Sequence, residues 1–242
     1  MRLTKMIGGV GYCSRRQASR LIEEGRVSVN GEGAQHLTFV DYDDKIYIDG
    51  EAIDMSNEKY YVAYHKPVGI DCNLNIDDPD SLLHVMPQSF PRLFPIGRLD
   101  KDSCGLLLLT NDGELANRLL QPEFKQPKCY DVRVEPSFSN RSRNIVELSD
   151  DFQLQMNEPI MIKGKLTTAC KITLTDDLRF TITLTQGLNR QIRKMCSHLG
   201  FNVTHLKRLS MANIMLGSLP TGEWRTVNDD ELRELNELLI VV

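Results

Sequence analysis

Residues 95–115 read PIGRLDKDSCGLLLLTNDGEL, and this stretch decides how the chain folds. The run GLLLL at 105–109 is short, continuous and apolar, which predicts a buried strand. Thr110 or Asn111 is then expected to cap a helix, whose apolar face holds Leu115, Ala116, Leu119 and Leu120. Asp100 is expected to lie in the loop just before this buried strand.

Asp100 stands between Arg98 and Lys101, and an acid placed between two cations tends to stay ionised. An ionised carboxylate acts as an acceptor or a nucleophile rather than as a general acid. The alternative is an aspartate that only makes turn hydrogen bonds, which is the common use of Asp in loops. The local sequence leaves both interpretations open.

The window 186–208 carries five basic residues and no acid, in a chain of net charge −4. Gly187 leads into NRQIRKMCSHLG, which predicts a helix that ends at Gly200. Arg190 and Arg193 are three residues apart on this helix, away from its apolar side, which holds Ile192, Met195, Cys196 and Leu199. Such a cluster indicates an anionic partner, and phosphate is the common one.

Further alternating segments indicate more strands, namely CYDVRV at 129–134 and FTITLT at 180–185. The strands do not alternate regularly with helices. This pattern favours an α+β fold with a mixed, mainly antiparallel sheet for the larger part of the chain, residues 59–242.

The amino end has a different character. Ser14 can cap a helix that stops at Gly25, and Arg15, Arg16 and Arg20 lie off its apolar stripe. A hairpin with the turn Asn30-Gly31 follows, and residues 45–48 (KIYI) predict another strand. Residues 1–30 carry a charge of +4 and residues 31–58 a charge of −7, which suggests a nucleic-acid or membrane surface at the amino end.

Composition excludes several classes of protein. The chain of 242 residues is 41% hydrophobic and 26% charged, which is typical of a globular protein. Its negative net charge excludes a globally basic nucleic-acid binder. We expect no signal peptide and no membrane span, since no apolar run approaches about 20 residues. The six cysteines lack zinc-ribbon spacing, and free thiols in a cytoplasmic protein are expected.

Four ordered segments carry a resemblance to a known family. GRLDKDSCGLLLLTNDG at 97–113 is similar to the signature of the RsuA-type pseudouridine synthases. Three further segments resemble other motifs of this family, namely HKPVGI at 65–70, KCYDVRV at 128–134 and QGLNRQIRKM at 186–195. QGLNRQIR and GEWR at 222–225 most resemble the F-type branch of the family, which modifies large-subunit ribosomal RNA. Residues 1–52 resemble the S-four RNA-binding domain, so we expect an S-four-like domain and linker over 1–58 and a catalytic domain over 59–242.

The resemblance implies a site-specific, cofactor-free and metal-free isomerisation of uridine to pseudouridine in large-subunit (23S) ribosomal RNA. By this resemblance Asp100 is the catalytic carboxylate, Tyr130 stacks on the base and accepts a proton, and Arg193 pairs with Asp100. Arg98 fills the stack when the base is flipped out, a step that buried base atoms require. Ile192 either walls the base pocket or only packs in the core.

We expect the partner to be ribosomal RNA or a pre-ribosomal particle, bound by a cytoplasmic monomer without a membrane. The basic residues expected to contact RNA phosphates are Arg190, Lys194, Arg15, Arg16 and Arg20.

Three other functions are conceivable from parts of the sequence. A noncatalytic ribosomal-RNA-binding or ribosome-assembly protein could use the same fold, although Asp100, Tyr130 and Arg193 are all present. A metal-dependent phosphoryl hydrolase could be built on Asp77, Asp78 and Asp80, but Asp and Pro crowd ordinary turns. A zinc site from Cys196, His198 and His205 is improbable, because residues two apart do not share a helix face.

Overall fold

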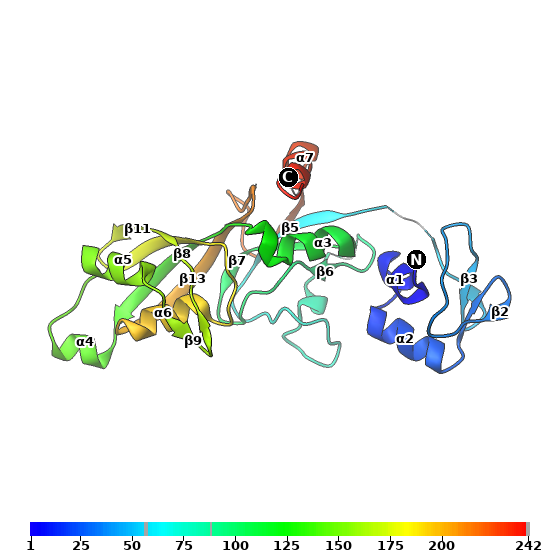
Figure 1. The fold of residues 1–242 in the computed structure, drawn as a ribbon, viewed down its shortest axis with the longest axis horizontal. Helices are drawn as coiled ribbons and strands as arrows, with labels where there is room; N and C mark the ends of the chain where they lie inside the picture. The colour runs from blue at the N-terminus through cyan, green and yellow to red at the C-terminus, as the bar shows by residue number, and fades with distance from the viewer. Residues whose placement is uncertain (56–57, 88, 241–242) are drawn as a thin grey trace.

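The computed structural model describes residues 1–55, 58–87 and 89–240. Figure 1 shows an elongated molecule in which a small amino-terminal domain lies at one end and a larger sheet domain fills the rest. The two are joined by a segment that leads into β5 (Tyr61–Lys66). The loop at Pro91 approaches the turn at Gly11, so the domains also touch away from this segment.

The amino-terminal domain packs two helices on a small antiparallel sheet. The helices are α1 (Leu3–Gly9) and α2 (Arg15–Glu23), and Ser14 caps α2 by accepting a hydrogen bond from the Gln17 amide at 3.1 Å. The strand order is β2-β1-β3-β4, with bounds Glu32–Gly33, Val27–Val29, Ile46–Ile48 and Glu51–Ala52. The domain has its own core, whose fully buried members include Leu3, Met6, Ile7, Ala18, Val27 and Ile46.

The predicted turn between β1 and β2 is confirmed. Asn30 and Gly31 both have positive φ, 53° and 89°, as a type I′ turn requires. The tight turn brings Val29 opposite Glu32 and closes the hairpin.

The larger domain is built on a nine-stranded sheet with the order β11-β12-β8-β13-β7-β5-β15, to which β14 and β6 add at β13 and β7. Among the described strands, β13 and β7 alone pair in parallel, through Lys207 opposite Cys104 and Arg208 opposite Gly105. We call this short pairing the seam. It joins two halves of the sheet, in each of which neighbouring strands run antiparallel. Besides β5, the strands of this sheet are β6 (Phe94–Pro95), β7 (Cys104–Thr110), β8 (Lys128–Pro136), β11 (Lys171–Asp176), β12 (Arg179–Leu184), β13 (Phe201–Met211), β14 (Ile214–Met215) and β15 (Trp224–Thr226).

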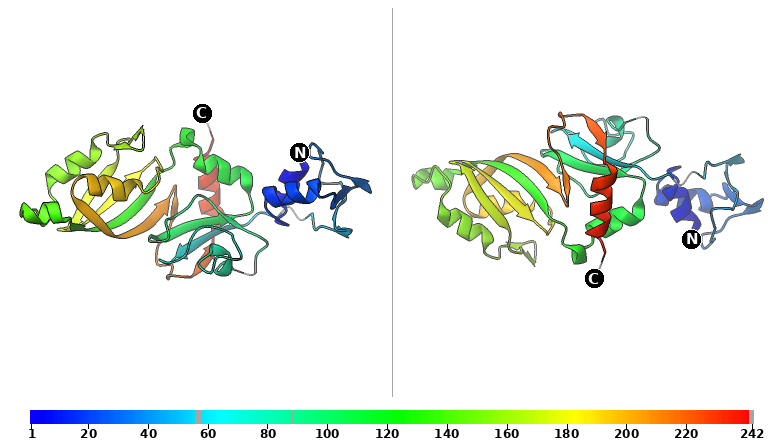
Figure 2. Two further views of the ribbon diagram at one scale, coloured as in Figure 1. Left: turned by 90° about the horizontal axis from the view of Figure 1, so that it is seen from below. Right: turned by 90° about the horizontal axis from the view of Figure 1, so that it is seen from above.

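Each half of the sheet has its own helices. Helices α5 (Asp150–Asn157) and α6 (Gln191–His198) pack on the β8–β12 half through Phe152 and Met195. Helices α3 (Gly113–Leu120) and α7 (Asp229–Glu237) pack on the β5–β7 half through Leu115 and Leu235. Figure 2 shows both halves and the amino-terminal domain in a row. The remaining described elements are α4 (Phe138–Ser142), β9 (Met161–Ile162), β10 (Lys165–Leu166) and the 3-10 helices η1 (Leu82–His84) and η2 (Pro122–Phe124).

The structure confirms the predicted α+β class and the mixed, mainly antiparallel sheet. The predicted helix cap was wrong: β7 runs on through Thr110, and Asp112 instead accepts hydrogen bonds from the first turn of α3. Leu120 is also not on the buried face, being 48% exposed at the helix end.

All six cysteines are unpaired thiols. In the described ranges, no helix combines the length and the apolarity that crossing a bilayer requires.

Candidate active site

A cleft of about 1100 Å³ opens over the seam. Its lining comes from the loop before β7, the start of β8, the loop that leads into α6 and the end of β13, and parts of the segments 68–71 and 119–121 also contribute. Residues that line the cleft include Arg98, Asp100, Asp102, Lys128, Tyr130, Arg190, Ile192 and Arg208.

The loop before β7 holds Asp100 at the cleft while anchoring itself in the core. Its neighbour Leu99 is 6% exposed, and the Leu99 amide donates to the buried Cys72 Sγ at 3.4 Å. The Ser103 amide donates to the Asp100 carbonyl at 3.0 Å and closes a tight turn. The carboxylate of Asp100 stays 31% exposed, so it is fixed in position yet open to a bound molecule.

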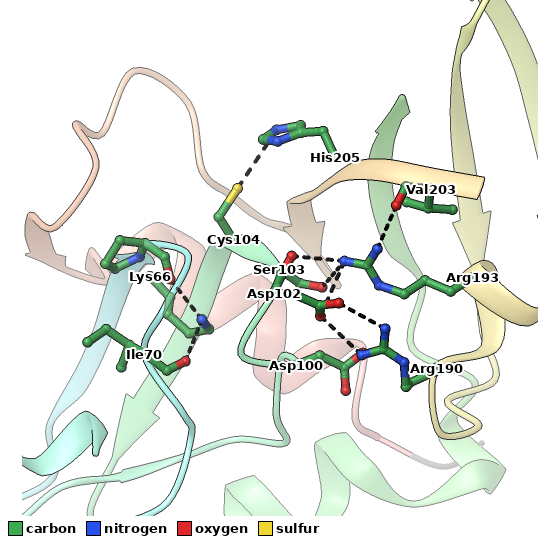
Figure 3. Close-up of polar contacts among 11 residues, drawn as sticks. Lys66, Ile70, Asp100, Asp102, Ser103, Cys104, Arg190, Arg193, Val203 and His205 are labelled. Atoms are coloured by element: carbon green, nitrogen blue, oxygen red, sulfur yellow. Dashed lines mark hydrogen bonds and ion pairs between the residues drawn. The ribbon is translucent and has the colours of Figure 1, made fainter. Parts of the chain in front are cut away.

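Arg190 pairs with both acids of this loop (Figure 3). Its two terminal nitrogens donate to the Asp102 carboxylate at 3.1 and 2.8 Å, and Nη1 lies 3.6 Å from Asp100 Oδ2. The hydrogen bond from Arg190 lowers the pKa of Asp102. Asp102 therefore holds the arginine in a bidentate grip, whereas Asp100 makes a looser contact and keeps an oxygen available.

The expected pairing of Arg193 with Asp100 is wrong. Arg193 donates to the carbonyls of Val203 at 3.0 Å and Asp102 at 2.8 Å and to Ser103 Oγ at 3.2 Å, and its ion pair is with Asp102 at 3.3 Å (Figure 3). The reason is local. Arg190 precedes the helix in a left-handed conformation, φ 53°, and from there its side chain pairs with Asp100, while Arg193, one turn on, bonds the loop backbone.

The other expected base-pocket residues reach the cleft. Tyr130 lies on β8 opposite Ile182 and Arg208, half-buried and packed between two core clusters. Ile192 is 4% exposed, belongs to the core and also lines the cleft. Arg98 is exposed at the cleft.

The remaining basic residues lie elsewhere. Lys194 Nζ donates a hydrogen bond to Asn189 Oδ1 at 3.4 Å. Lys194 is not among the described residues that line the cleft. Arg15, Arg16 and Arg20 are exposed on α2 in the amino-terminal domain. Lys101, expected beside Asp100, instead pairs with Asp80 at 2.5 Å.

Sequence reasoning missed three cations near the cleft, of which Lys66 and Arg208 are buried. Lys66 is fully buried on β5, donates to the carbonyls of Pro67 and Ile70 at 2.8 and 2.7 Å, and has its pKa lowered by burial. Lys128 and Arg208 line the cleft itself. The basic window 186–208 included Arg208, but the pattern gave no sign that its side chain is buried.

The two alternative metal sites do not assemble. The Asp78 carboxylate accepts from Asn73 Nδ2 at 2.6 Å and from the Asp80 amide at 3.0 Å, so it stabilises its own loop. His205 contacts Cys104 Sγ at 3.8 Å, and Cys196 is buried in the core. Across the described part of the chain, no three His, Cys, Asp or Glu side chains gather closely enough to hold a metal ion.

Comparison with known proteins agrees with this geometry. The model of the RNA pseudouridylate synthase family matches residues 60–198, and the model of the S4 domain matches residues 1–36. The dual-specificity RNA pseudouridine synthase RluF of Escherichia coli strain K12 is 39% identical over 241 residues, which are 99% of this chain and 79% of that protein.

Two further relatives agree. Ribosomal large subunit pseudouridine synthase B of Bacillus subtilis is 35% identical over 98% of this chain and 96% of its own length. A crystal structure of a pseudouridylate synthase has a TM-score of 0.68 at 27% identity, covering 97% of this chain and 99% of that one. The fold, the cleft and these matches together confirm the resemblance drawn from the four motifs: the chain belongs to the RNA pseudouridylate synthase family and carries an amino-terminal S4 domain.

Proposed function

We propose that this enzyme converts a specific uridine of large-subunit ribosomal RNA to pseudouridine, with Asp100 as the catalytic carboxylate. The observation that carries the proposal is Asp100 itself, held by a core-anchored loop yet 31% exposed in a cleft. The choice of RNA is supported by the B. subtilis relative, which is named for the ribosomal large subunit.

The reaction needs no oxidant, reductant or cofactor, because product and substrate are isomers. The C1′–N1 bond of the uridine breaks, the uracil turns in the cleft, and a C1′–C5 bond forms. The proton on C5 leaves and N1 gains one. We assign Asp100 to the attack that separates base from ribose, and Tyr130, which lines the same cleft, to stacking on the base and accepting the C5 proton.

We assign different roles in this reaction to the three arginines near the cleft and to two further residues. Arg190, 3.6 Å from Asp100 and 42% exposed, is assigned to orienting the carboxylate and meeting RNA phosphate. Arg193 is assigned to positioning: it holds the loop through the Asp102 carbonyl and Ser103. Arg98, exposed at the cleft, is assigned to the space that the flipped base leaves. Ile192 is assigned to the pocket wall, and Lys194 to the RNA backbone.

The amino-terminal domain is assigned to RNA binding. Within the described residues, Arg15, Arg16 and Arg20 form no ion pair, which leaves three exposed charges on α2 for phosphates. We place the domain boundary at residue 58, and we propose that the enzyme acts as a monomer in the cytoplasm, where ribosomal RNA is the substrate.

Mapping pseudouridines in ribosomal RNA from cells with and without this protein tests the function. One large-subunit position should lose its pseudouridine in the deleted strain. Purified protein should then restore it on an unmodified transcript without added metal or cofactor, and the Asp100→Asn protein should not. An unchanged map, with binding but no turnover in vitro, would favour the noncatalytic RNA-binding alternative.

A further inference from the structure

Arg208 is a buried cation with an unfilled hydrogen bond in the wall of the cleft. Its residue is 2% exposed, and its Nε donates to the Leu106 carbonyl at 2.7 Å. Its Nη2 is buried and forms no hydrogen bond. A buried charged donor without a partner is unfavourable, so the position suits a group that arrives from outside and accepts a hydrogen bond.

This part of the cleft carries positive charge without a matching carboxylate. Within the described ranges, the cleft residues Lys101 and Arg190 form ion pairs with acids, whereas neither Arg208 nor Lys128 takes part in one. Lys128 donates only to the Gln126 carbonyl, at 3.2 Å. Burial and the neighbouring Arg208 lower the pKa of Lys128, which indicates that two like charges lie close together and lack a counter-ion.

Strand register places Arg208 beside Tyr130. Arg208 lies opposite Tyr130 on β8 and opposite Gly105 on β7, and Gly105 in turn lies opposite Lys66. Partners across a sheet project from the same face, with Cβ atoms about 5 Å apart. A base stacked on Tyr130 would therefore present its edge to Arg208, and Gly105, on the other side of Arg208, adds no side chain to this part of the sheet.

Burial decides which part of the RNA this arginine meets. The phosphates of a flipped nucleotide stay with the backbone at the cleft mouth, where Arg190 and Arg98 are exposed. The base goes deepest. Resting on the proposed function, we propose that Arg208 is a further catalytic residue, which binds a carbonyl oxygen of the flipped uracil and stabilises the negative charge that forms on the base.

The electron balance explains why a cation is useful there. When the C1′–N1 bond breaks, its electron pair leaves with the uracil and C1′ takes a new bond from the Asp100 carboxylate. The departing base is then an anion whose charge is shared by N1 and the two carbonyl oxygens. A fixed cation in a buried site stabilises such charge strongly. When C5 attacks C1′, the C1′–O bond breaks, its electron pair and the negative charge return to the Asp100 carboxylate, and the C5 proton is then lost while N1 gains one.

The test compares Arg208→Gln with Lys207→Gln. Lys207 precedes Arg208 on β13 and does not line the cleft as described, so the control removes the same charge from the other face of the strand. The substrate is the large-subunit RNA fragment found by mapping. Arg208→Gln should lower the single-turnover rate at saturating RNA by at least about 100-fold, and Lys207→Gln should leave that rate unchanged.

Two further measurements show whether Arg208 contacts the base or a phosphate of the RNA. An RNA in which the target uridine is abasic keeps the phosphates, and Arg208→Gln should bind it as tightly as the wild type does. Guanidinium ion at millimolar concentration should restore part of the rate of Arg208→Ala and none of the rate of Asp100→Asn. Weaker binding of abasic RNA by Arg208→Gln, with a normal rate once saturated, would overturn the proposal in favour of a phosphate contact.

The outcomes distinguish this inference from the proposed function. If the wild type forms no pseudouridine, the function fails; if it does and Arg208→Gln keeps its rate, only this inference fails. Should Arg208→Gln not fold, a crystal structure of Asp100→Asn bound to the RNA decides. An Arg208 nitrogen within hydrogen-bond distance of a uracil oxygen supports the proposal, and a base edge bound elsewhere overturns it.

Discussion

Asp100 and Asp102 stand two residues apart on one loop, and their surroundings give the two carboxylates different uses. Asp102 receives both terminal nitrogens of Arg190 and the ion pair of Arg193, so its oxygens are occupied. Asp100 has one loose contact at 3.6 Å. A nucleophile needs a free oxygen, and of these two carboxylates Asp100 is the one that has it. Asp102 instead holds the arginines in place.

Asp100→Asn should therefore lower the single-turnover rate by more than about a thousandfold, because the substitution keeps the size of the side chain and removes its charge and nucleophilicity. RNA affinity and melting temperature should stay close to those of the wild type. Asp102→Asn serves as the comparison and should lose less activity. A rate for Asp100→Asn within tenfold of the wild-type rate, about 1.4 kcal/mol, would remove Asp100 from its assigned role.

Asp102 should also make stability depend on acid. Arg190 lowers the pKa of Asp102 in the folded protein, so its contribution is present above the unfolded pKa, about 3.9, and is lost as pH falls through the folded pKa. Because the side chain is 46% exposed, solvent screening keeps this contribution small. Thermal melts from pH 6 down to pH 3 should show a shallower loss for Asp102→Asn than for the wild type. Parallel curves would contradict this prediction.

Arg193→Ala should reduce stability and turnover together. The side chain is 12% exposed and its hydrogen bonds tie the loop to β13 through Val203. Losing charged hydrogen bonds of this kind costs about 2–3 kcal/mol, measurable by urea unfolding. Arg193→Lys should recover part of the stability, since it restores the charge without the planar fork. Arg193→Ala with normal unfolding and normal turnover would show that the loop holds itself.

At the scale of elements, the seam between β7 and β13 is the most constrained feature. It is the only parallel contact among the described strands of the large sheet, and it spans two residue pairs. At Gly105, φ is +104°, and an added Cβ would lie 2.3 Å from the Arg208 carbonyl oxygen. The two halves can approach this closely only because one of the strands carries no side chain there.

Gly105→Ala should accordingly destabilise the protein by about 2–4 kcal/mol, through backbone strain and the enforced separation of the strands. Activity should fall as well, because Arg208 moves with its strand. Gly113→Ala is a suitable control, since a Cβ there meets nothing closer than Phe94 at 3.9 Å. Urea unfolding of both variants checks this, and equal midpoints for the two would contradict it.

How far the sequence predicts these elements depends on whether a local signal exists. The apolar run at 105–109 and the alternation of apolar and polar residues at 180–185 predict β7 and β12, because the residue types themselves indicate which side chains are buried. The cap of α3 was misplaced because Thr110, Asn111 and Asp112 can all cap a helix. Pairing of Thr110 with Tyr61 and Phe94 extends β7 and leaves Asp112 as the cap.

The site was predictable in part for the same reason. Asp100 is found from its motif and its flanking charges. The arginine that pairs with Asp100 was misassigned because the helical spacing assumes a regular helix. Arg190 instead adopts a left-handed backbone conformation, which the sequence pattern does not predict. Arg208 belongs to a visible basic window, but its burial results from a contact with β7, more than a hundred positions away in sequence.

At the scale of the whole molecule, the two domains have separate cores. In the described ranges, the core of residues 3–55 shares no buried residue with the clusters that begin at residue 60. The loop at Pro91 reaches Gly11 across the boundary, but this contact lies outside both cores. Two cores joined by one segment favour independent folding of each part.

Removing residues 1–58 should leave a folded catalytic domain that binds ribosomal RNA more weakly. The slope of the logarithm of its RNA-binding constant against the logarithm of salt concentration should become shallower by up to about three units, since Arg15, Arg16 and Arg20 are removed with the domain. Titrations of RNA binding at several salt concentrations measure both effects. The triple variant with glutamine at these three positions is the matched control and should reproduce the lost slope. Equal affinity and equal slope in the truncated protein would show that this domain does not touch RNA.

The seam also sets the order in which the active site comes into being during synthesis. Asp100 and β7 leave the ribosome early, but the strand that completes the cleft carries residues 201–211. At elongation rates of about 5–20 residues per second, roughly 5–20 seconds separate Asp100 from Arg208. Until residues 190–208 have been made, the carboxylate sits on a half-sheet without Arg190, Arg193 and Arg208. We therefore expect a nascent copy of this enzyme to be inactive toward the RNA of the ribosome that is making it.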